Sequence, residues 1–397
     1  MHRADRRHRR LPVRALAAAT ALLAALTLAP AYAGDLNPSN PLADSGPWPH
    51  STITTAANPE YNNYLAAQRP QRKAAMAEIA LTPRMRWFAN CSTCNVERIR
   101  DTVTKYVADT RRKDPGALVQ LAIFGLWPRG EHVNGRRPAM TRNDLIAYKR
   151  WIKQLAAGLG NARTAIVLEP DLAISANHGG LSDPTPARRM AATAWSANYL
   201  ATTLRGEAIY LDAGSADWLT IDNAVRLLSR SGIQHVRGFA LGATHYDSVP
   251  DNVDYAARLS AALARAGHRA KRGVIDTADN GTPFTWPQWN ARWGALYRRT
   301  GNKAYAFDNT PTCGSSTEQV CQTIGHQPTW DVVGPEAGKL GLGEQQTALR
   351  TQAERYVDAY LWFGRGWRWM QQGGNDSQTP TRMVRMALHS RFDHPTG

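Results

Sequence analysis

Apolar and polar positions alternate along this chain with two different periods. Short runs of consecutive apolar residues, rich in β-branched side chains, are typical of buried parallel strands. Longer stretches with apolar residues every three or four positions predict amphipathic helices. The predicted strands are Met85–Phe88, Leu118–Phe124, Thr164–Leu168, Ala208–Asp212, Val236–Leu241, Arg272–Asp276 and Tyr360–Phe363. The predicted helices are Gln71–Ile79, Val96–Arg112, Arg142–Leu159, Pro186–Leu204, Thr220–Ser231, Asp251–Ala266 and Ala348–Tyr356. This alternation predicts an α/β fold, a TIM-barrel-like parallel (β/α) barrel.

One segment interrupts the alternation. Residues Asn280 to Gly343 are rich in Pro, Gly, Asn and Thr, and they include Trp286, Trp289, Trp293 and Trp330. A long irregular stretch inside a compact domain is usually functional or disordered, and the aromatic content favours a functional role.

The N-terminal region has the features of a targeting signal. Six arginines precede an apolar run from Ala15 to Ala29, and Ala31-Tyr32-Ala33 follows as a small-x-small cleavage site. We expect residues 1–33 to be a signal peptide cleaved near Ala33, with no membrane span, and the protein to be secreted or associated with the cell wall. Residues 34–60, rich in Pro, Asn and Ser, are expected to form an exposed lead-in. Residues 61–397 are expected to form a single barrel domain that acts as a monomer.

Charge and cysteine content narrow the possible partners. The net charge of +16 is spread along the chain without a basic run that interleaves aromatics, so no nucleic-acid partner is expected. In an oxidising compartment the cysteines favour the disulfides Cys91–Cys94 and Cys313–Cys321, although other pairings are open. A redox or zinc role for the Cys-x-x-Cys is disfavoured, because no thioredoxin-like pattern surrounds it and no histidine lies at finger spacing. We expect no cofactor and no metal.

Carboxylates follow three of the predicted strands. Glu169-Pro170-Asp171 comes directly after the third strand, Asp212 ends the fourth, and Asp276 ends the sixth. The carboxyl ends of parallel barrel strands form one rim, where active sites of such barrels lie. Each aspartate alone could cap a helix, but three at one rim favour a shared site.

Tryptophans lie in or near the same loops: Trp218, Trp289, Trp293, Trp362, Trp367 and Trp369. Because sugar rings stack on flat aromatic faces, carboxylates and tryptophans together predict a groove for a polysaccharide. About half of these tryptophans could instead belong to the core, and Trp362 is expected to do so.

Several motifs carry a family resemblance. They are Leu168-Glu169-Pro170-Asp171, Tyr210-Leu211-Asp212-Ala213-Gly214-x-x-x-Trp218, Arg237-Gly238-Phe239-Ala240, Ile275-Asp276-Thr277-x-x-Asn280-Gly281 and Val357-Asp358-Ala359-Tyr360-Leu361-Trp362. In order and spacing they resemble glycoside hydrolase family 6, which contains secreted cellobiohydrolases and endo-β-1,4-glucanases. The resemblance implies a distorted barrel of seven parallel strands and inversion at the anomeric carbon. It implies that Asp171 is the general acid and Asp212 a supporting carboxylate. The candidate substrate-binding residues are Arg129, Trp218, Asp276, Asn280, Trp289, Trp293, Arg365 and Trp367.

The chain departs from the family pattern at two places. Gly130 stands where the family has a helper aspartate, and Phe124 stands where it has a tyrosine, although the neighbouring Glu131 could act as the helper. After the last strand, Gly364-Arg365-Gly366-Trp367-Arg368-Trp369 replaces a Lys, Glu and Asp pattern, so the usual candidate base is missing. Glu336 or Glu344 could supply a carboxylate instead. The arginines make an acidic or substituted glycan a plausible variant substrate.

Three functional hypotheses remain open. The leading one is a secreted, endo-acting, inverting glycoside hydrolase that cleaves a cellulose-like β-1,4-glucan or a related polysaccharide. The second is a carbohydrate-binding or scaffold protein that has lost turnover. The third, a metal-dependent polysaccharide deacetylase, would use His132, His178, His245 or His326, but none of these is paired at metal-ligand spacing.

Overall fold

The computed structural model describes residues 36–43, 46–55, 58–89, 98–112, 114–126, 141–174, 184–243, 245–372 and 376–392. These residues contain a seven-stranded sheet in which each strand pairs with the next along the chain. The strands are β1 (Arg86–Ala89), β2 (Val119–Phe124), β3 (Thr164–Leu168), β4 (Glu207–Asp212), β5 (Gly238–Leu241), β6 (Arg272–Asp276) and β7 (Val357–Leu361). Every pairing is parallel. The predicted α/β architecture with seven parallel strands is confirmed.

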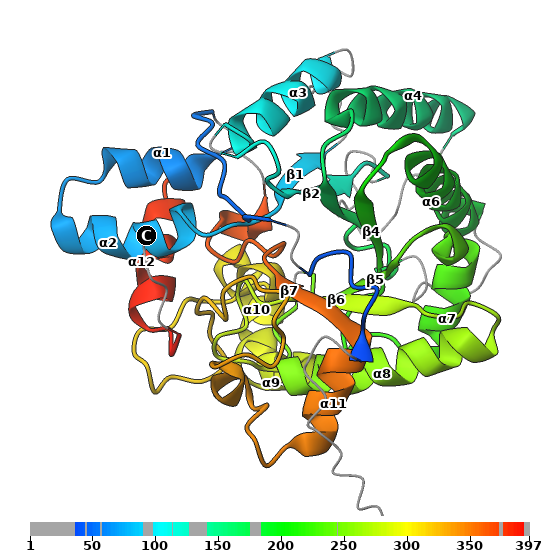
Figure 1. Ribbon diagram of the computed structural model, residues 1–397. Coiled ribbons are helices and arrows are strands. Elements are labelled where there is room, and N and C mark those ends of the chain that lie inside the picture. The colour runs from blue at the N-terminus through cyan, green and yellow to red at the C-terminus, as the bar shows by residue number, and fades with distance from the viewer. Residues whose placement is uncertain are drawn as a thin grey trace, which may run out of the picture. The chain divides into compact units, whose positions relative to one another are not determined.

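Helices follow the strands and surround the sheet (Figure 1). The α-helices are α1 (Pro59–Ala66), α2 (Pro70–Ala80), α3 (Ile99–Thr110), α4 (Arg142–Leu159), α6 (Pro184–Thr203), α7 (Ile221–Arg230), α8 (Val249–Arg265), α9 (Trp286–Trp289), α10 (Ala295–Thr300), α11 (Thr347–Tyr356) and α12 (Thr379–Leu388). All seven predicted helices are present with small shifts at their ends. Helices α1 and α12 were not predicted, and both contact α2.

The two faces of the strands have different packing partners. Ala165 and Val167 of β3 face the barrel interior with Ala208 and Tyr210 of β4. Their neighbours along each strand pack against the surrounding helices. Because side chains alternate along a strand, Asp212 continues the inward register of Ala208 and Tyr210 and lies at the carboxyl end of the interior. The same alternation carries Asp276 inward after Val274.

The barrel is distorted where β1 meets β7. Among the described residues no strand ladder joins these two strands. Instead the Met85 backbone N–H donates to the carbonyl oxygen of Trp362 at 2.8 Å. The Trp87 indole N–H donates to the carbonyl oxygen of Phe363 at 2.7 Å. Single hydrogen bonds therefore join β1 to the residues directly after β7.

The segment before α1 is not the exposed lead-in that its composition predicts. Leu42 has 0% exposure and packs among the inward-facing side chains of the strands. The Asn37 amide donates to Asp358 at the start of β7 at 2.7 Å. The Leu118 backbone N–H donates to the carbonyl oxygen of Pro47 at 3.1 Å. These contacts lie at the amino ends of the strands, so the segment closes the end of the barrel opposite the strand-end carboxylates.

Some predictions concern parts of the chain outside the described residues. The proposed signal peptide and the cysteines Cys91 and Cys94 are among them. The predicted disulfide between Cys313 and Cys321 is confirmed. No helix in the described part of the chain is long and apolar enough to cross a membrane.

Replacing Leu42 with Ala should lower the free energy of unfolding by about 2–5 kcal/mol, because the deletion leaves a cavity inside the barrel. Urea unfolding followed by circular dichroism measures the change. Leu65→Ala is the matched control, since Leu65 is 47% exposed and should change stability by less than about 0.5 kcal/mol. Equal effects of the two substitutions would contradict the packing of Leu42 inside the barrel.

Candidate active site

The chain turns sharply where β3 ends. Glu169 and Asp171 both have left-handed backbone, with φ of 57° and 67°. This conformation costs non-glycine residues roughly 1–3 kcal/mol and is often retained at functional sites. It separates the two acidic side chains: Glu169 is buried at 1% exposure, whereas Asp171 remains partly exposed.

Glu169 anchors the turn to the neighbouring elements. Its carboxylate accepts hydrogen bonds from the backbone N–H groups of Gly125 and Leu126 and from the Tyr148 hydroxyl of α4, all at 2.9–3.1 Å. Burial raises the pKa of Glu169 to about 7, against the opposing effect of these hydrogen bonds. Glu169 therefore fixes the β2 and β3 loops relative to each other, and its neighbour Asp171 is held in a defined position.

Asp212 lies beside Asp171. It has 0% exposure, and its Oδ2 accepts a hydrogen bond from the backbone N–H of Ala173 at 3.1 Å. Its Oδ1 has no hydrogen-bond partner among the described residues. Burial and then the charge of Asp171 raise the pKa of Asp212 to about 7. Burial and the neighbouring charge of Asp171 therefore both favour the protonated form of Asp212.

Asp276 belongs to a second carboxyl pair. Its Oδ1 accepts hydrogen bonds from the backbone N–H groups of Ala278 and Phe363. Within the described part of the chain, the Oδ2 atoms of Asp276 and Asp279 have no hydrogen-bond partner. Burial raises the pKa of Asp276 to about 7, and burial together with the charge of Asp276 raises the pKa of Asp279 well above its usual range.

Gly364 packs directly against this second pair. A Cβ at position 364 would lie 2.6 Å from Asp276 Oδ2 and 3.0 Å from both oxygens of Asp279. A side chain is therefore excluded at this position unless the aspartates move.

Arg365 reaches the region of Asp171. Its guanidinium lies over the Trp87 ring at 3.8 Å from the ring centre. Burial and the charge of Arg368 lower the pKa of Arg365, while the carboxylates of Glu60 and Asp171 oppose this shift. The strand-end acid and this arginine, predicted separately from sequence, thus lie within electrostatic range of each other.

Trp367 and Arg368 are held by Glu60 of α1. Trp367 has 0% exposure, and its indole N–H donates to Glu60 Oε1 at 2.6 Å. Arg368 donates to Glu60 Oε2 at 2.8 Å. Because its side chain is fully enclosed, Trp367 supports the loop in this structure and presents no surface to a substrate.

The other tryptophans differ in exposure. Trp218 is partly exposed and stacks on the His245 ring at 4.6 Å with an interplanar angle of 14°. Trp293 is partly exposed and stacks on Tyr305. Trp289 is only 3% exposed, and Trp362 is fully buried, as expected for a core residue. Trp286, which sequence patterns did not single out as a site residue, is 47% exposed and packs against Phe307 at 4.8 Å.

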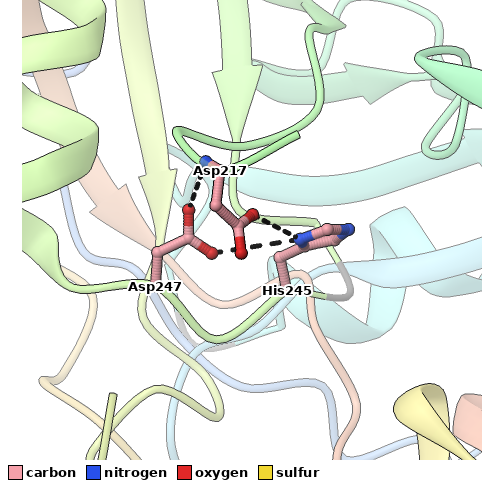
Figure 2. A group of neighbouring side chains, drawn as sticks. All are labelled: Asp217, His245 and Asp247. Carbon is pink, nitrogen blue, oxygen red and sulfur yellow. Dashed lines mark hydrogen bonds and ion pairs between the residues drawn. The ribbon is translucent and has the colours of Figure 1, made fainter. Parts of the chain in front are cut away.

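A cluster formed by Asp217, His245 and Asp247 lies at the carboxyl ends of β4 and β5 (Figure 2). His245 Nδ1 is 3.1 Å from Asp217 Oδ1 and 3.9 Å from Asp247 Oδ1. Asn280 supports the cluster by donating a hydrogen bond to the carbonyl oxygen of Asp247 at 3.0 Å. Sequence spacing did not reveal this group because its members come from two different strand-end loops.

Comparison with known proteins decides the family. The model of glycosyl hydrolases family 6 matches residues 43–314, which is more than half of the chain. The chain belongs to this family.

The relatives and solved structures agree with this assignment. The family-6 chain is 29% identical over 256 residues to endoglucanase A of Cellulomonas fimi, covering 63% of this chain and 52% of that protein. It is 30% identical over 288 residues to endoglucanase A of Thermobispora bispora, covering 71% of this chain and 58% of that protein. The matches thus span little more than half the length of these curated relatives.

Solved structures share the fold. An endoglucanase from Mycobacterium tuberculosis superposes with a TM-score of 0.62 at 20% identity, over 88% of this chain and 99% of that one. Cellobiohydrolase II of Humicola insolens gives a TM-score of 0.56 at 18% identity, over 81% and 85% of the two chains.

Several predicted residues of this family-6 chain cannot be located. Arg129, Gly130 and Glu131 lie outside the described residues, as do His132 and His178. Glu336 pairs with Lys339 at 2.8 Å and lies 3.6 Å from His326, whereas Glu344 is exposed.

Asp279→Asn should stabilise the protein more at pH 8 than at pH 5. A carboxyl whose folded pKa lies above its unfolded value of about 4 contributes stability at low pH and loses it as the pH rises through the folded pKa. Removing Asp279 removes that loss and the repulsion with Asp276. We expect the stability difference from wild type to grow by at least about 1 kcal/mol between pH 5 and 8, measured by urea unfolding. Asp222→Asn on the exposed surface of α7 is the control, and a difference that stays constant with pH would disprove the buried pair.

Proposed function

We propose that this protein is an inverting glycoside hydrolase that cleaves internal bonds of a cellulose-like β-1,4-glucan or a related polysaccharide. The observation that carries the proposal is the placement of Asp171 and Asp212 beside each other at the carboxyl ends of the neighbouring strands β3 and β4 in a family-6 barrel. The endoglucanase names of the relatives favour internal cleavage.

The two carboxyl groups take different roles. Asp171 is partly exposed and donates its proton to the glycosidic oxygen as the bond to the anomeric carbon breaks. Asp212 is enclosed, its pKa is raised to about 7 by burial and by the charge of Asp171, and it takes the role of supporting carboxylate. In an inverting reaction a water attacks the opposite face of the sugar, and its activating carboxylate lies roughly 6.5–9.5 Å from the acid. Glu131 in the loop after β2 is our candidate for the helper of this step.

Substrate binding uses the exposed aromatic and cationic groups of the same rim. Trp218 and Trp286 offer partly exposed ring faces for sugar stacking. Arg365 adds a cation near Asp171, which would favour a glycan that carries acidic substituents. Arg129, Asp276, Asn280, Trp289 and Trp293 remain candidates, with buried Asp276, Asn280 and Trp289 acting through the shape of the site.

We also propose that the chain is secreted after cleavage near Ala33 and works as a monomer without a nucleic-acid partner. The basic and apolar leader and the spread of positive charge support this proposal.

Asp171→Asn should lower the rate of hydrolysis by about 10²–10⁴-fold, because a general acid contributes that much to the rate. Reducing-sugar release from a soluble β-1,4-glucan measures activity, and circular dichroism with thermal unfolding shows whether the variant folds. Asp222→Asn should retain full activity. Undiminished hydrolysis by a folded Asp171→Asn protein would refute the assignment of the acid.

The stereochemistry of the product gives an independent test. Inversion of a β-1,4 bond should release the α anomer first, which proton NMR detects in the opening minutes of the reaction. Release of the β anomer would refute the inverting mechanism.

A glycan-binding protein without turnover is the second candidate. It is favoured by Gly130 at the helper position. It is also favoured by Gly364, which begins the segment that replaces the family's Lys, Glu and Asp pattern and whose contacts with Asp276 and Asp279 exclude a side chain. Binding to a polysaccharide panel, measured beside product release, separates the two functions. Saturable binding with no release at high protein concentration would favour this candidate.

A further inference from the structure

The hydrolysis proposed above uses none of Asp217, His245 and Asp247 as a reacting group. Their cluster offers one nitrogen and two carboxylate oxygens that all lie within 4.8 Å of one another. Figure 2 shows the two carboxylates and the imidazole facing one another from the loops after β4 and β5. This combination of ligand types is the one that first-row divalent metals bind in proteins.

In each of the two aspartates, Oδ2 accepts hydrogen bonds from the protein and Oδ1 faces the centre of the cluster. Asp217 Oδ2 accepts the backbone N–H of Trp286 at 2.7 Å. Asp247 Oδ2 accepts the Ser215 hydroxyl at 2.6 Å and the backbone N–H of Asp217 at 3.0 Å. Both Oδ1 atoms are left facing His245 Nδ1. Hydrogen bonds of this kind orient the ligands of metal sites.

The imidazole is also fixed in place. Trp218 stacks on one face of the His245 ring. Phe307 makes an edge-to-face contact with the same ring, with 5.0 Å between the two ring centres. The backbone N–H of His245 donates to the carbonyl oxygen of Gly242 at 3.0 Å. Ordering of these groups before an ion arrives lowers the entropic cost of binding.

A buried oxygen of Asp247 without a hydrogen-bond donor favours a bound cation at this cluster. Asp247 is 2% exposed, and its Oδ1 makes no hydrogen bond to any residue that the structure describes. His245 Nδ1 lies 3.9 Å from it, which is too long for a hydrogen bond. A buried carboxylate oxygen without a donor is costly, and a metal ion between the three side chains would remove that cost.

We propose that Asp217 Oδ1, His245 Nδ1 and Asp247 Oδ1 bind one divalent transition-metal ion of the size of Zn²⁺. Ligands of a tetrahedral zinc ion lie about 3.3 Å apart, and small movements bring the contacts of 3.1 and 3.9 Å to that spacing. Calcium fits less well because it takes six to eight oxygen ligands. Binding requires neutral Nδ1, so a protonated His245 releases that proton to solvent as the metal bond forms.

Three protein ligands leave a coordination position for water or for a substrate oxygen. The side chains of Asp217 and His245 are 13% and 10% exposed, so solvent reaches the cluster. Trp218 covers His245 and is our candidate sugar platform, so a hydroxyl or carboxylate of a bound glycan would lie near this position. This last step rests on the proposed function, whereas binding of the ion does not.

The test uses the untagged chain, stripped with EDTA and titrated with ZnCl₂ in a calorimeter. We expect one equivalent to bind with a Kd below about 10 μM. Asp247→Asn and His245→Gln should each weaken binding at least tenfold. The new Asn oxygen can still accept the Ser215 hydroxyl, which favours a folded variant. His268→Gln is the control, because His268 contacts Ser229 at the other end of the barrel.

Two further readouts make the result decisive. Replacement of zinc by Co²⁺ should give the visible absorption of a tetrahedral site, and zinc should raise the Tm of wild type but not of Asp247→Asn. Absence of saturable zinc binding, or binding that both substitutions leave unchanged, would overturn the proposal. Zinc binding without hydrolysis would count against the proposed function alone, and hydrolysis without zinc binding would count against this inference alone.

Discussion

The burial of carboxyl groups at one end of a parallel barrel is the constraint on which this structure depends. Glu169, Asp212, Asp247, Asp276 and Asp279 are each at most 3% exposed. Loss of water disfavours the charged form, and burial is the main cause of the raised pKa at all five. The chain compensates in different ways. Backbone N–H groups and Tyr148 satisfy Glu169, whereas the aspartates are coupled to a second carboxyl or to His245.

The pKa of Glu60 is shifted in the opposite direction. It is buried, but the charges of Arg368 and Arg84 lower its pKa well below the usual range despite desolvation. Its bonds to Trp367 and Arg368 join α1 to the segment after β7. Part of the arginine and tryptophan content that replaces the family pattern here is therefore structural. Arg365 is the member of this segment that comes within range of Asp171.

Sequence patterns located elements better than they located contacts. Strands β3 and β6 begin and end where predicted, because aliphatic runs in both lead directly into acidic residues. Strand-end position alone identified Asp171 and Asp212 as neighbours. The left-handed turn at Glu169 could not be predicted, since neither Glu nor Asp requires positive φ. The Asp217, His245 and Asp247 cluster, the enclosure of Trp367 and the burial of Leu42 all arise from contacts between distant segments, which no local pattern encodes.

Gly130 stands where the family resemblance leads one to expect a helper carboxylate, so the acid chemistry proposed for Asp171 depends on other carboxyl groups, of which Asp212 lies beside it. Asp212 lies in the inward register of β4, so its burial follows from the alternation of the strand. That burial and the charge of Asp171 raise the pKa of Asp212 to about 7. The positive charge of His245 opposes the shift of Asp212. The pKa of Asp212 therefore depends on the charge state of His245 in the neighbouring cluster, and the two sites on this rim are electrostatically linked.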